Sequence, residues 1–350
     1  MKFWGFVLPP ADSGRRDLKN LPSFVTEVFL LVKSIFVTHP FKEKMFDIVR
    51  SHVPEGLSVV VAETDAQEEC IEKIRDADYL LAGHAVRVDA ALLDAGNKLK
   101  MVQRLGVGLD NVDRAAMIKR GIPLYVNRGV NSRSVAELTL TLMLGLLRRL
   151  PMLDAGIRVF DWDRNECSRH EIHGKTIGLI GFGSIGSLVS EMLRPFGVKI
   201  LYFKPNRLPE EDEAKYDVSY RRLDDLLGES DIISLHCMMN DENRGMMNRE
   251  TFAKMRDGAW LINTSRGALI NDSDFADAIL SGKLSGAALD VFCVEPLPDD
   301  SLLRSLPNVI LTPHAGVTQE AFMRIITEGM GNIGKFDRGE LEAIAERRLV

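Results

Sequence analysis

The length, composition and charge of the chain exclude several classes of protein. Its 350 residues suffice for two domains of roughly 150 residues each, and a hydrophobic content of 45% excludes disorder as the main state. The net charge is -6 and acids and bases are interspersed, so no basic tract is offered to nucleic acid or to an anionic membrane surface. We therefore expect a small-molecule partner.

We expect neither a secretion signal nor a membrane-spanning segment in this sequence. The apolar run after Met1 is interrupted at Pro9 and Pro10, where a secretion signal would continue. The most apolar stretches, residues 28–37 and 138–147, are shorter than the about 20 residues of a membrane span. The four cysteines form no Cys-x-x-Cys pair, which argues against a zinc cluster or a disulfide framework. We expect a soluble cytoplasmic protein without a metal.

Short apolar runs alternate with helical patterns along the chain. The first series of predicted strands comprises residues 34–37, 59–62, 79–82, 101–104 and 124–126. The second series comprises residues 176–180, 198–203, 232–235, 259–263, 287–291 and 309–312. This alternation predicts an α/β fold with two successive units, each built on a parallel sheet. Residues 1–31 precede the first strand as an extension of unknown role.

An apolar helix is predicted between the two series, over residues 134–150. Ser134 and Glu137 have the spacing of a capping box, and Pro151 would stop the helix. Leucine, methionine or valine occurs on both faces, so the helix should be buried against protein on more than one side.

A glycine-rich turn follows the predicted strand 176–180. The turn reads Gly181-Phe182-Gly183-Ser184-Ile185-Gly186. Helical periodicity follows over residues 188–196, so strand, turn and helix occur in the order of a dinucleotide-binding motif. The first glycine permits the tight turn, the second lets a pyrophosphate approach the backbone, and the third lets helix and strand pack closely. The helix N-terminus would face the phosphates.

The next strand ends in cations. An acid about 20 residues past the glycines would bind the ribose 2'-hydroxyl of NAD, but Lys204 stands there and Arg207 follows. A carboxylate would repel a 2'-phosphate, whereas Lys204 and Arg207 could pair with it through charge-assisted hydrogen bonds. We therefore expect NADP to be preferred over NAD. The alternative interpretation is that both cations are solvated surface residues.

Three later segments each place one polar residue just past a predicted strand, at the edge where open α/β sheets bind ligands. These residues are Arg266, Glu295 and His314. Arg266 could hold carboxylate and carbonyl oxygens together while stabilising developing negative charge. His314 suits proton transfer, since an ordinary histidine pKa is about 6.5, and Glu295 would orient the imidazole and favour its cationic form. Taken singly, each residue also fits a solvated or structural role.

Two further motifs accompany these residues. They are Gly106-Val107-Gly108-Leu109-Asp110-Asn111-Val112-Asp113 and Ser134-Val135-Ala136-Glu137. Together the motifs resemble the D-isomer-specific 2-hydroxyacid dehydrogenase family, from about residue 34 to about residue 335. The resemblance implies two Rossmann-like or flavodoxin-like domains. The substrate domain would be discontinuous, with residues 32–128 and 318–350, and residues 129–317 would bind the dinucleotide.

The resemblance also implies a reaction and its binding residues. An NAD(P)-dependent oxidoreductase would transfer hydride between the nicotinamide and a 2-keto or 2-hydroxy acid, with His314 as acid in reduction and base in oxidation. Substrate contacts are implied at Val107, Gly108, Arg266 and His314. Coenzyme contacts beyond the glycine turn, Lys204 and Arg207 are implied at His236, Cys237, Thr264, Asp290 and Gly316. The helix 134–150 would form a homodimer contact.

The substrate itself stays open. The loop at residues 83–87, which contains His84, shapes the pocket by resemblance, and glyoxylate or hydroxypyruvate fits its small residues. Arg104, near the glycine loop, keeps a phosphorylated acid open, although a phosphoglycerate dehydrogenase would here lack a regulatory domain. Phosphite oxidation uses a related triad. Formate oxidation is disfavoured, because Glu295 stands where glutamine is expected. An alternative of another class is an NAD(P)-sensing corepressor that retains the triad.

Overall fold

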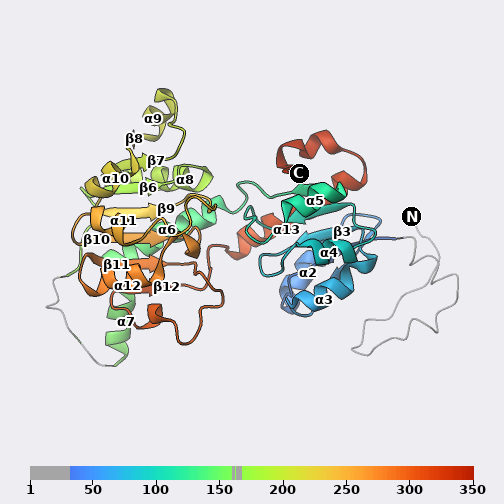
Figure 1. Cartoon of the computed structure of the whole chain (residues 1–350), viewed down its shortest axis with the longest axis horizontal. Coiled ribbons are helices and arrows are strands. Elements are labelled where there is room, and N and C mark those ends of the chain that lie inside the picture. Colours follow the sequence, from blue (N-terminus) through green and yellow to red (C-terminus); the bar gives the residue numbers. More distant parts are fainter. Residues whose placement is uncertain (1–31, 160–161, 163–167) are drawn as a thin grey trace.

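The computed structural model describes residues 32–159, 162 and 168–350. The predicted extension, residues 1–31, lies outside the described part. Figure 1 shows two α/β units, joined by the segment that leads into helix α6 (Ser132–Leu147) and by the segment that leads into helix α13 (Gln319–Asp337). Within the described part, no helix has the length and apolarity needed to cross a bilayer.

The first unit is a five-stranded sheet in the order β2-β1-β3-β4-β5, with all pairs parallel. Its strands are β1 (Lys33–Val37), β2 (Leu57–Val61), β3 (Tyr79–Ala82), β4 (Met101–Arg104) and β5 (Leu124–Tyr125). Its helices are α2 (Glu43–Ser51), α3 (Gln67–Lys73), η2 (Ile74–Asp76), α4 (Ala90–Ala95) and α5 (Arg114–Arg120). The central strands β3 and β4 are buried at every position, because helices cover both faces of the sheet.

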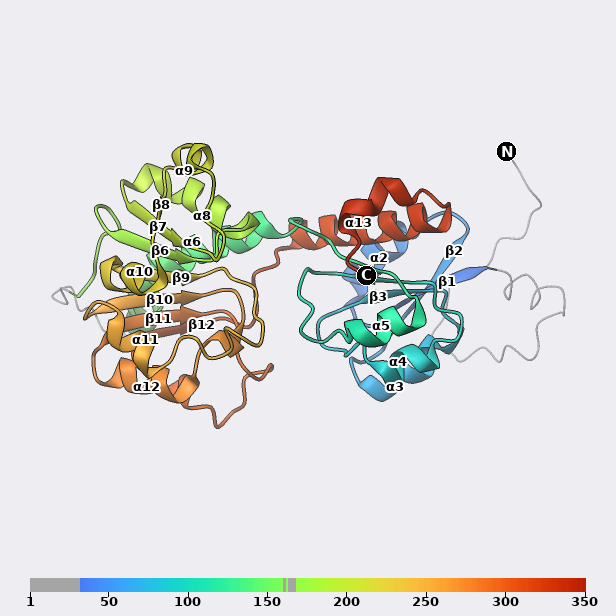
Figure 2. The ribbon, with the colours of Figure 1, turned by 45° about the horizontal axis from the view of Figure 1, so that its top comes forward.

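The C-terminal segment completes this first unit. Helix α13 (Gln319–Asp337) follows the last strand of the second unit, yet it packs beside α2 on the first sheet (Figure 2). Its buried Ile326 and Met330 join Ile35 and Leu81 in one hydrophobic cluster. The short helix η6 (Leu341–Arg347) then brings Arg348 against Tyr125. Two chain segments far apart in sequence therefore share one core.

The second unit is a seven-stranded parallel sheet in the order β12-β11-β10-β9-β6-β7-β8. Its strands are β6 (Thr176–Ile180), β7 (Lys199–Phe203), β8 (Ser219–Tyr220), β9 (Ile232–Leu235), β10 (Ala259–Asn263), β11 (Leu284–Leu289) and β12 (Val309–Leu311). Its helices include α8 (Ser184–Leu193), η3 (Arg194–Phe196), α9 (Glu210–Tyr216), α10 (Leu223–Glu229), α11 (Arg249–Lys254), η4 (Gly267–Leu269), α12 (Asp272–Leu280) and η5 (Leu302–Ser305). The strand order reverses between β6 and β9, and such a switch point is where open α/β sheets bind ligands.

The strand predictions and the α/β class are confirmed, with shifts at the ends of single strands. The largest shift is at β11, which begins at Leu284, three residues before the predicted strand. Its exposed Ser285 and the following Gly286 interrupt the apolar run that served as the strand signal. The two-residue strand β8 carried too short a pattern to be predicted.

The predicted capping box of the connecting helix is wrong. Helix α6 spans Ser132–Leu147, so Ser134 lies inside it. The Ser134 hydroxyl donates to the Gly316 carbonyl at 2.7 Å and accepts from the Thr318 amide at 3.0 Å. The Ser134 hydroxyl therefore bonds to residues that are distant in sequence and does not cap the helix.

The predicted stop of this helix at Pro151 needs a second correction. A new helix, α7 (Leu150–Arg158), begins there, and Pro151 lies in its first turn. Proline is tolerated at that position because its missing N–H would have no helical partner. The proline therefore starts a helix as well as following the end of α6.

Candidate active site

The glycine turn joins β6 to α8 at the switch point of the second sheet. Gly181 has φ +97°, and a Cβ there would overlap the backbone of Cys237. A Cβ at Gly186 would overlap the carbonyl oxygen of Gly181, whereas one at Gly183 would meet no atom within 4 Å. Chain packing thus requires the first and third glycines, and the second leaves open space before the N-terminus of α8. This cradle fits a pyrophosphate.

The remaining residues of the turn differ in what they offer a ligand. The Phe182 side chain is 6% exposed and packs on Tyr202, with ring centroids 5.0 Å apart, so only its backbone is available. Ser184 is exposed and Ile185 half-buried in the first turn of α8.

The two predicted 2'-phosphate cations have different surroundings. Arg207 forms a two-pronged pair with Glu213, from Nε to Oε1 and from Nη2 to Oε2, both at 2.8 Å. This pairing lowers the pKa of Glu213 to about 2, so the carboxylate is charged. Half-buried Lys204, at the end of β7, has no side-chain hydrogen bond or ion pair among the described residues. Glu213 was not predicted as a partner of Arg207, although it lies only six residues after it.

His236 and Cys237 follow β9 and lie against the glycine turn. The His236 Nε2 atom lies 2.9 Å from the Ser234 hydroxyl, and burial lowers the pKa of His236 to about 4. Burial also raises the pKa of the Cys237 thiol to about 11. Near neutral pH His236 is therefore a neutral imidazole and Cys237 a protonated thiol, which suits neither to proton donation nor to nucleophilic attack.

Asp290, a predicted coenzyme contact, braces the turn that carries His314. It is 1% exposed and accepts hydrogen bonds from the Thr312 hydroxyl at 2.6 Å and the Ala315 amide at 2.7 Å. Its own carbonyl accepts from the His314 amide at 2.8 Å. These contacts hold His314 at φ +52°, a left-handed conformation that a non-glycine residue adopts only when its surroundings enforce it.

Two more predicted coenzyme contacts lie nearby. The Thr264 hydroxyl lies 2.9 Å from that of Thr139 on α6, and the Gly316 carbonyl accepts from Ser134 on the same helix. Both therefore connect the carboxyl edge of the sheet to α6.

His314 and Glu295 form a hydrogen-bonded pair. The His314 Nδ1 atom lies 2.7 Å from Glu295 Oε2, and Glu295 Oε1 accepts from the Phe292 amide at 2.9 Å. The hydrogen bond that His314 donates to Glu295 raises the pKa of His314. Burial alone would raise the pKa of Glu295, but the hydrogen bonds from His314 and Phe292 outweigh it and lower that pKa. The pair thus favours an imidazolium whose Nε2–H is left to donate a proton.

Arg266 lies in the loop after β10. The Asn263 side chain holds this loop by donating to the Arg266 carbonyl at 2.9 Å and accepting from the Ser265 amide at 3.0 Å. A Cβ at Gly267 would overlap the backbone of Phe292, so the loop packs tightly on the segment that leads to Glu295. Arg266 and the His314–Glu295 pair therefore lie on adjoining loops.

The Arg266 guanidinium reaches the first α/β unit. Nε donates to Asp110 Oδ2 at 2.7 Å, and Nη1 donates to the Ser265 carbonyl at 2.7 Å. Nη2 occupies the space where a Cβ of Gly108 would be, next to the partly exposed Val107. The structure thus brings Arg266 to the glycine loop in which substrate contacts are predicted.

Arg104 lies at the end of β4 and is bonded to backbone carbonyls. Its guanidinium is buried, 3% exposed, and donates to the Gly83 carbonyl and, at 3.1 Å, to the Gly108 carbonyl. Burial, with a further contribution from Arg266, lowers its pKa to about 10, which still leaves it charged. Arg104 therefore joins the loop after β3 to the loop after β4.

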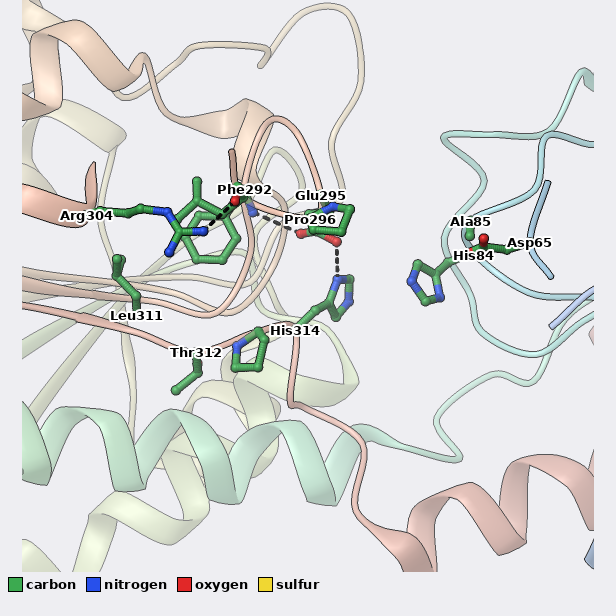
Figure 3. Close-up of a pocket in the computed structure, with 12 residues that line it drawn as sticks. Asp65, His84, Ala85, Phe292, Glu295, Pro296, Arg304, Leu311, Thr312 and His314 are labelled. Carbon is green, nitrogen blue, oxygen red and sulfur yellow. Dashed lines mark hydrogen bonds and ion pairs between the residues drawn. The ribbon is translucent and has the colours of Figure 1, made fainter. Parts of the chain in front are cut away.

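His84 faces His314 across the space between the domains. Their ring centroids are 5.5 Å apart, and burial, followed by the nearby His314, lowers the pKa of His84. The two rings belong to a pocket of about 790 Å³, whose two walls come from different domains (Figure 3). Its lining residues are Asp65, His84, Ala85, Phe292, Glu295, Pro296, Leu297, Arg304, Leu311, Thr312, Pro313 and His314. Within the described part, no cluster of His, Cys, Asp or Glu could hold a metal ion.

Comparison with known proteins gives a family match and several similar relatives. Residues 140–316 match the model of the D-isomer specific 2-hydroxyacid dehydrogenase, NAD binding domain. A hydroxypyruvate reductase of Thermotoga maritima is 39% identical over 280 residues, covering 79% of this chain and 90% of the relative. A D-3-phosphoglycerate dehydrogenase of Mycobacterium tuberculosis is 40% identical over 75% of this chain, which spans about half of that relative (49%).

A solved structure extends the similarity to the whole fold. The D-lactate dehydrogenase of Aquifex aeolicus, complexed with NAD and lactic acid, superposes with a TM-score of 0.81 at 29% identity. The match covers 91% of this chain and 99% of that one. This chain therefore belongs to the D-isomer-specific 2-hydroxyacid dehydrogenase family, and it is a nicotinamide-dependent oxidoreductase acting on CH–OH groups.

Proposed function

We propose that the chain is an NADPH-preferring reductase of small 2-keto acids such as hydroxypyruvate or glyoxylate. The observation that carries the proposal is the His314–Glu295 pair, 2.7 Å apart, on a loop adjoining that of Arg266. A proton donor and a guanidinium beside a dinucleotide cradle are the groups that reduction of a keto acid requires.

Each of these residues has a defined part in the reaction. A bound reduced nicotinamide supplies the hydride to the keto carbon. Arg266 and the backbone amides of Val107 and Gly108 hold the substrate carboxylate, and Arg266 stabilises negative charge on the carbonyl oxygen. His314 Nε2 donates the proton to that oxygen, while Glu295 stabilises the imidazolium beforehand. In oxidation the neutral His314 accepts the proton back.

The coenzyme preference rests mainly on Lys204. Its ammonium is without an ion pair among the described residues, at the end of the strand where a ribose substituent would lie. Arg207 would have to leave Glu213, or be shared with it, to contact a 2'-phosphate. We therefore assign the discrimination to Lys204 first and to Arg207 second.

A second candidate substrate is a phosphorylated acid, which the Mycobacterium tuberculosis relative favours by its name. The pocket argues against it. Arg104 is bound to backbone carbonyls, and the one arginine in the pocket wall, Arg304, donates to the carbonyls of Leu297 and Pro298. The pocket lining also includes Asp65 and Glu295, one from each domain, whose carboxylates would repel a dianion. We therefore favour unphosphorylated acids.

A substrate panel tests the proposal. Purified protein is mixed with NADPH or NADH at equal concentrations and with hydroxypyruvate, glyoxylate, pyruvate or phosphohydroxypyruvate, and nicotinamide absorbance is followed. We expect the highest kcat/KM with NADPH and hydroxypyruvate or glyoxylate. A preference of tenfold or more for phosphohydroxypyruvate would overturn the substrate assignment, and about a tenfold advantage of NADH would overturn the coenzyme assignment.

The proposal includes a cytoplasmic homodimer assembled through α6 and α7. The support is that α7 exposes Leu150 by 60% and Ile157 by 53%, although both side chains are apolar. A second copy could cover them. Analytical ultracentrifugation should give twice the chain mass of 39.1 kDa, and a single species at the chain mass would contradict the dimer.

A further inference from the structure

One ion pair in the site has no part in the chemistry described so far. Asp110 belongs to the loop after β4 in the first unit, and Arg266 follows β10 in the second. Asp110 Oδ2 and Arg266 Nε are 2.7 Å apart, with side chains 37% and 33% exposed. The catalytic arginine is thus held by a carboxylate from the opposite domain.

We propose that Asp110 is a positioning residue for Arg266, one that orients the guanidinium only when the two domains approach each other. The inference deepens the proposed function and rests on it. Its basis is the number of donors on the guanidinium, the charges around it and the domain to which each partner belongs.

The donor count shows what Asp110 does to the guanidinium. An arginine has five N–H groups in one rigid plane. Asp110 takes the one on Nε, and the Ser265 carbonyl takes one on Nη1. Two anchors on separate nitrogens fix the plane and direct Nη2 to the backbone at Gly108. A substrate carboxylate at that loop therefore meets donors that are already oriented.

Asp110 also reduces the positive charge at the substrate loop. Arg104 and Arg266 repel each other, and the Asp110 carboxylate attracts both. Arg104 has no carboxylate among its hydrogen-bond partners, which are backbone carbonyls. Two guanidinium groups and one carboxylate leave a net charge of +1 at the substrate loop. This charge complements one carboxylate, and Asp110 makes the loop less attractive to anions than two cations alone would.

Asp110 and Arg266 belong to different domains, so their ion pair forms only when the two domains approach each other. Arg266 is bound to its own domain through Ser265, but the acceptor for Nε arrives with the loop after β4. When the domains part, Nε loses that acceptor and the guanidinium regains rotational freedom. Closure of the cleft and orientation of the catalytic arginine thereby become one event.

Three variants test this inference. Asp110→Asn keeps a hydrogen-bond acceptor but removes the charge, and Asp110→Ala removes both. The matched control is Asp94→Asn, which removes the same charge from a surface pair with Arg120, outside the cleft. For each variant we would measure kcat and KM with the best substrate of the panel, NADPH affinity, melting temperature, and affinity of the NADPH-bound protein for oxamate, an unreactive monoanion.

The expected results separate orientation from charge. Asp110→Ala lowers kcat by about 10- to 100-fold, because a misplaced catalytic group costs about that much, while NADPH affinity changes less than twofold. Asp110→Asn lowers kcat less and binds oxamate more tightly than the wild type. Asp94→Asn matches the wild type. Unchanged kcat in both Asp110 variants overturns the inference, as does a parallel loss of NADPH affinity and melting temperature, which would show a structural role. Absence of turnover in the wild type would instead refute the proposed function, and oxamate affinity would then decide on Asp110.

Discussion

Glu295→Gln tests the proposed role of the His314–Glu295 pair in proton transfer. The substitution keeps the size of the side chain and removes the negative charge that lies 2.7 Å from His314 Nδ1. A hydrogen bond to a charged group contributes about 1.5–3 kcal/mol. The two side chains are 40% and 28% exposed, so solvent screening reduces this to about 1–2 kcal/mol. We therefore expect kcat/KM for keto acid reduction at neutral pH to fall about 5- to 30-fold.

The raised pKa of His314 also predicts the direction in which the pH profile moves when Glu295 is replaced. Glu295 raises the pKa of His314, so the imidazolium needed for reduction is present up to that raised pKa and is lost as pH increases through it. Without the carboxylate the pKa is lower, and the alkaline limb of the kcat/KM profile moves to lower pH. In the oxidation direction the neutral imidazole is required, so the rising limb also moves to lower pH.

Stopped assays across pH in both directions would measure these limbs. The control is Glu340→Gln, which removes an exposed carboxylate paired with Arg338 at 2.7 Å, far from the cleft. A Glu295→Gln enzyme with less than a twofold loss and unmoved limbs would refute the role of the pair. A loss of rate with unmoved limbs would leave Glu295 as an orienting group without influence on the His314 proton.

Three further predictions each concern the replacement of a single residue. Gly183→Ala should leave the melting temperature unchanged, since its Cβ meets no protein atom, but should weaken NADPH binding about tenfold or more in a fluorescence titration; equal affinity would contradict the cradle. Lys204→Asp should lower the NADPH-to-NADH ratio of kcat/KM by about tenfold or more, and an unchanged ratio would remove Lys204 from coenzyme selection. Arg104→Met should lower the free energy of unfolding in urea by about 2–4 kcal/mol, because the Gly83 and Gly108 carbonyls lose their donor; a change below about 0.5 kcal/mol would contradict its structural role.

The sequence predicted most of the architecture because the signals are local. Central strands such as β3, β9 and β10 are short runs buried at every position, and the glycine turn combines three local requirements in six residues. Arg266, Glu295 and His314 each stand just past a predicted strand end, and the carboxyl ends of parallel strands lie at one edge of a sheet. The chain order of the strands then brought the three loops to one edge.

The remaining features depend on partners that are distant in sequence. Ser134 has the local pattern of a helix cap, but its hydroxyl donates a hydrogen bond to the Gly316 carbonyl instead. Asp110 and Arg266 are 156 residues apart, and nothing near either one indicates the other. Arg207 is an exception, because Glu213 is close in sequence and helix α9 places its carboxylate within reach. An arginine or lysine that is followed closely by an acidic residue can therefore pair with that residue instead of with a ligand.

The measurement that tests the account most directly is a single-turnover reaction of NADPH-bound protein with hydroxypyruvate, followed by nicotinamide absorbance, in the wild type and in His314→Ala. We expect stoichiometric oxidation of NADPH by the wild type. In the variant we expect a rate lower by about 100-fold or more, with NADPH affinity nearly unchanged. Equal rates in the two proteins would contradict the assignment of His314 as the proton donor.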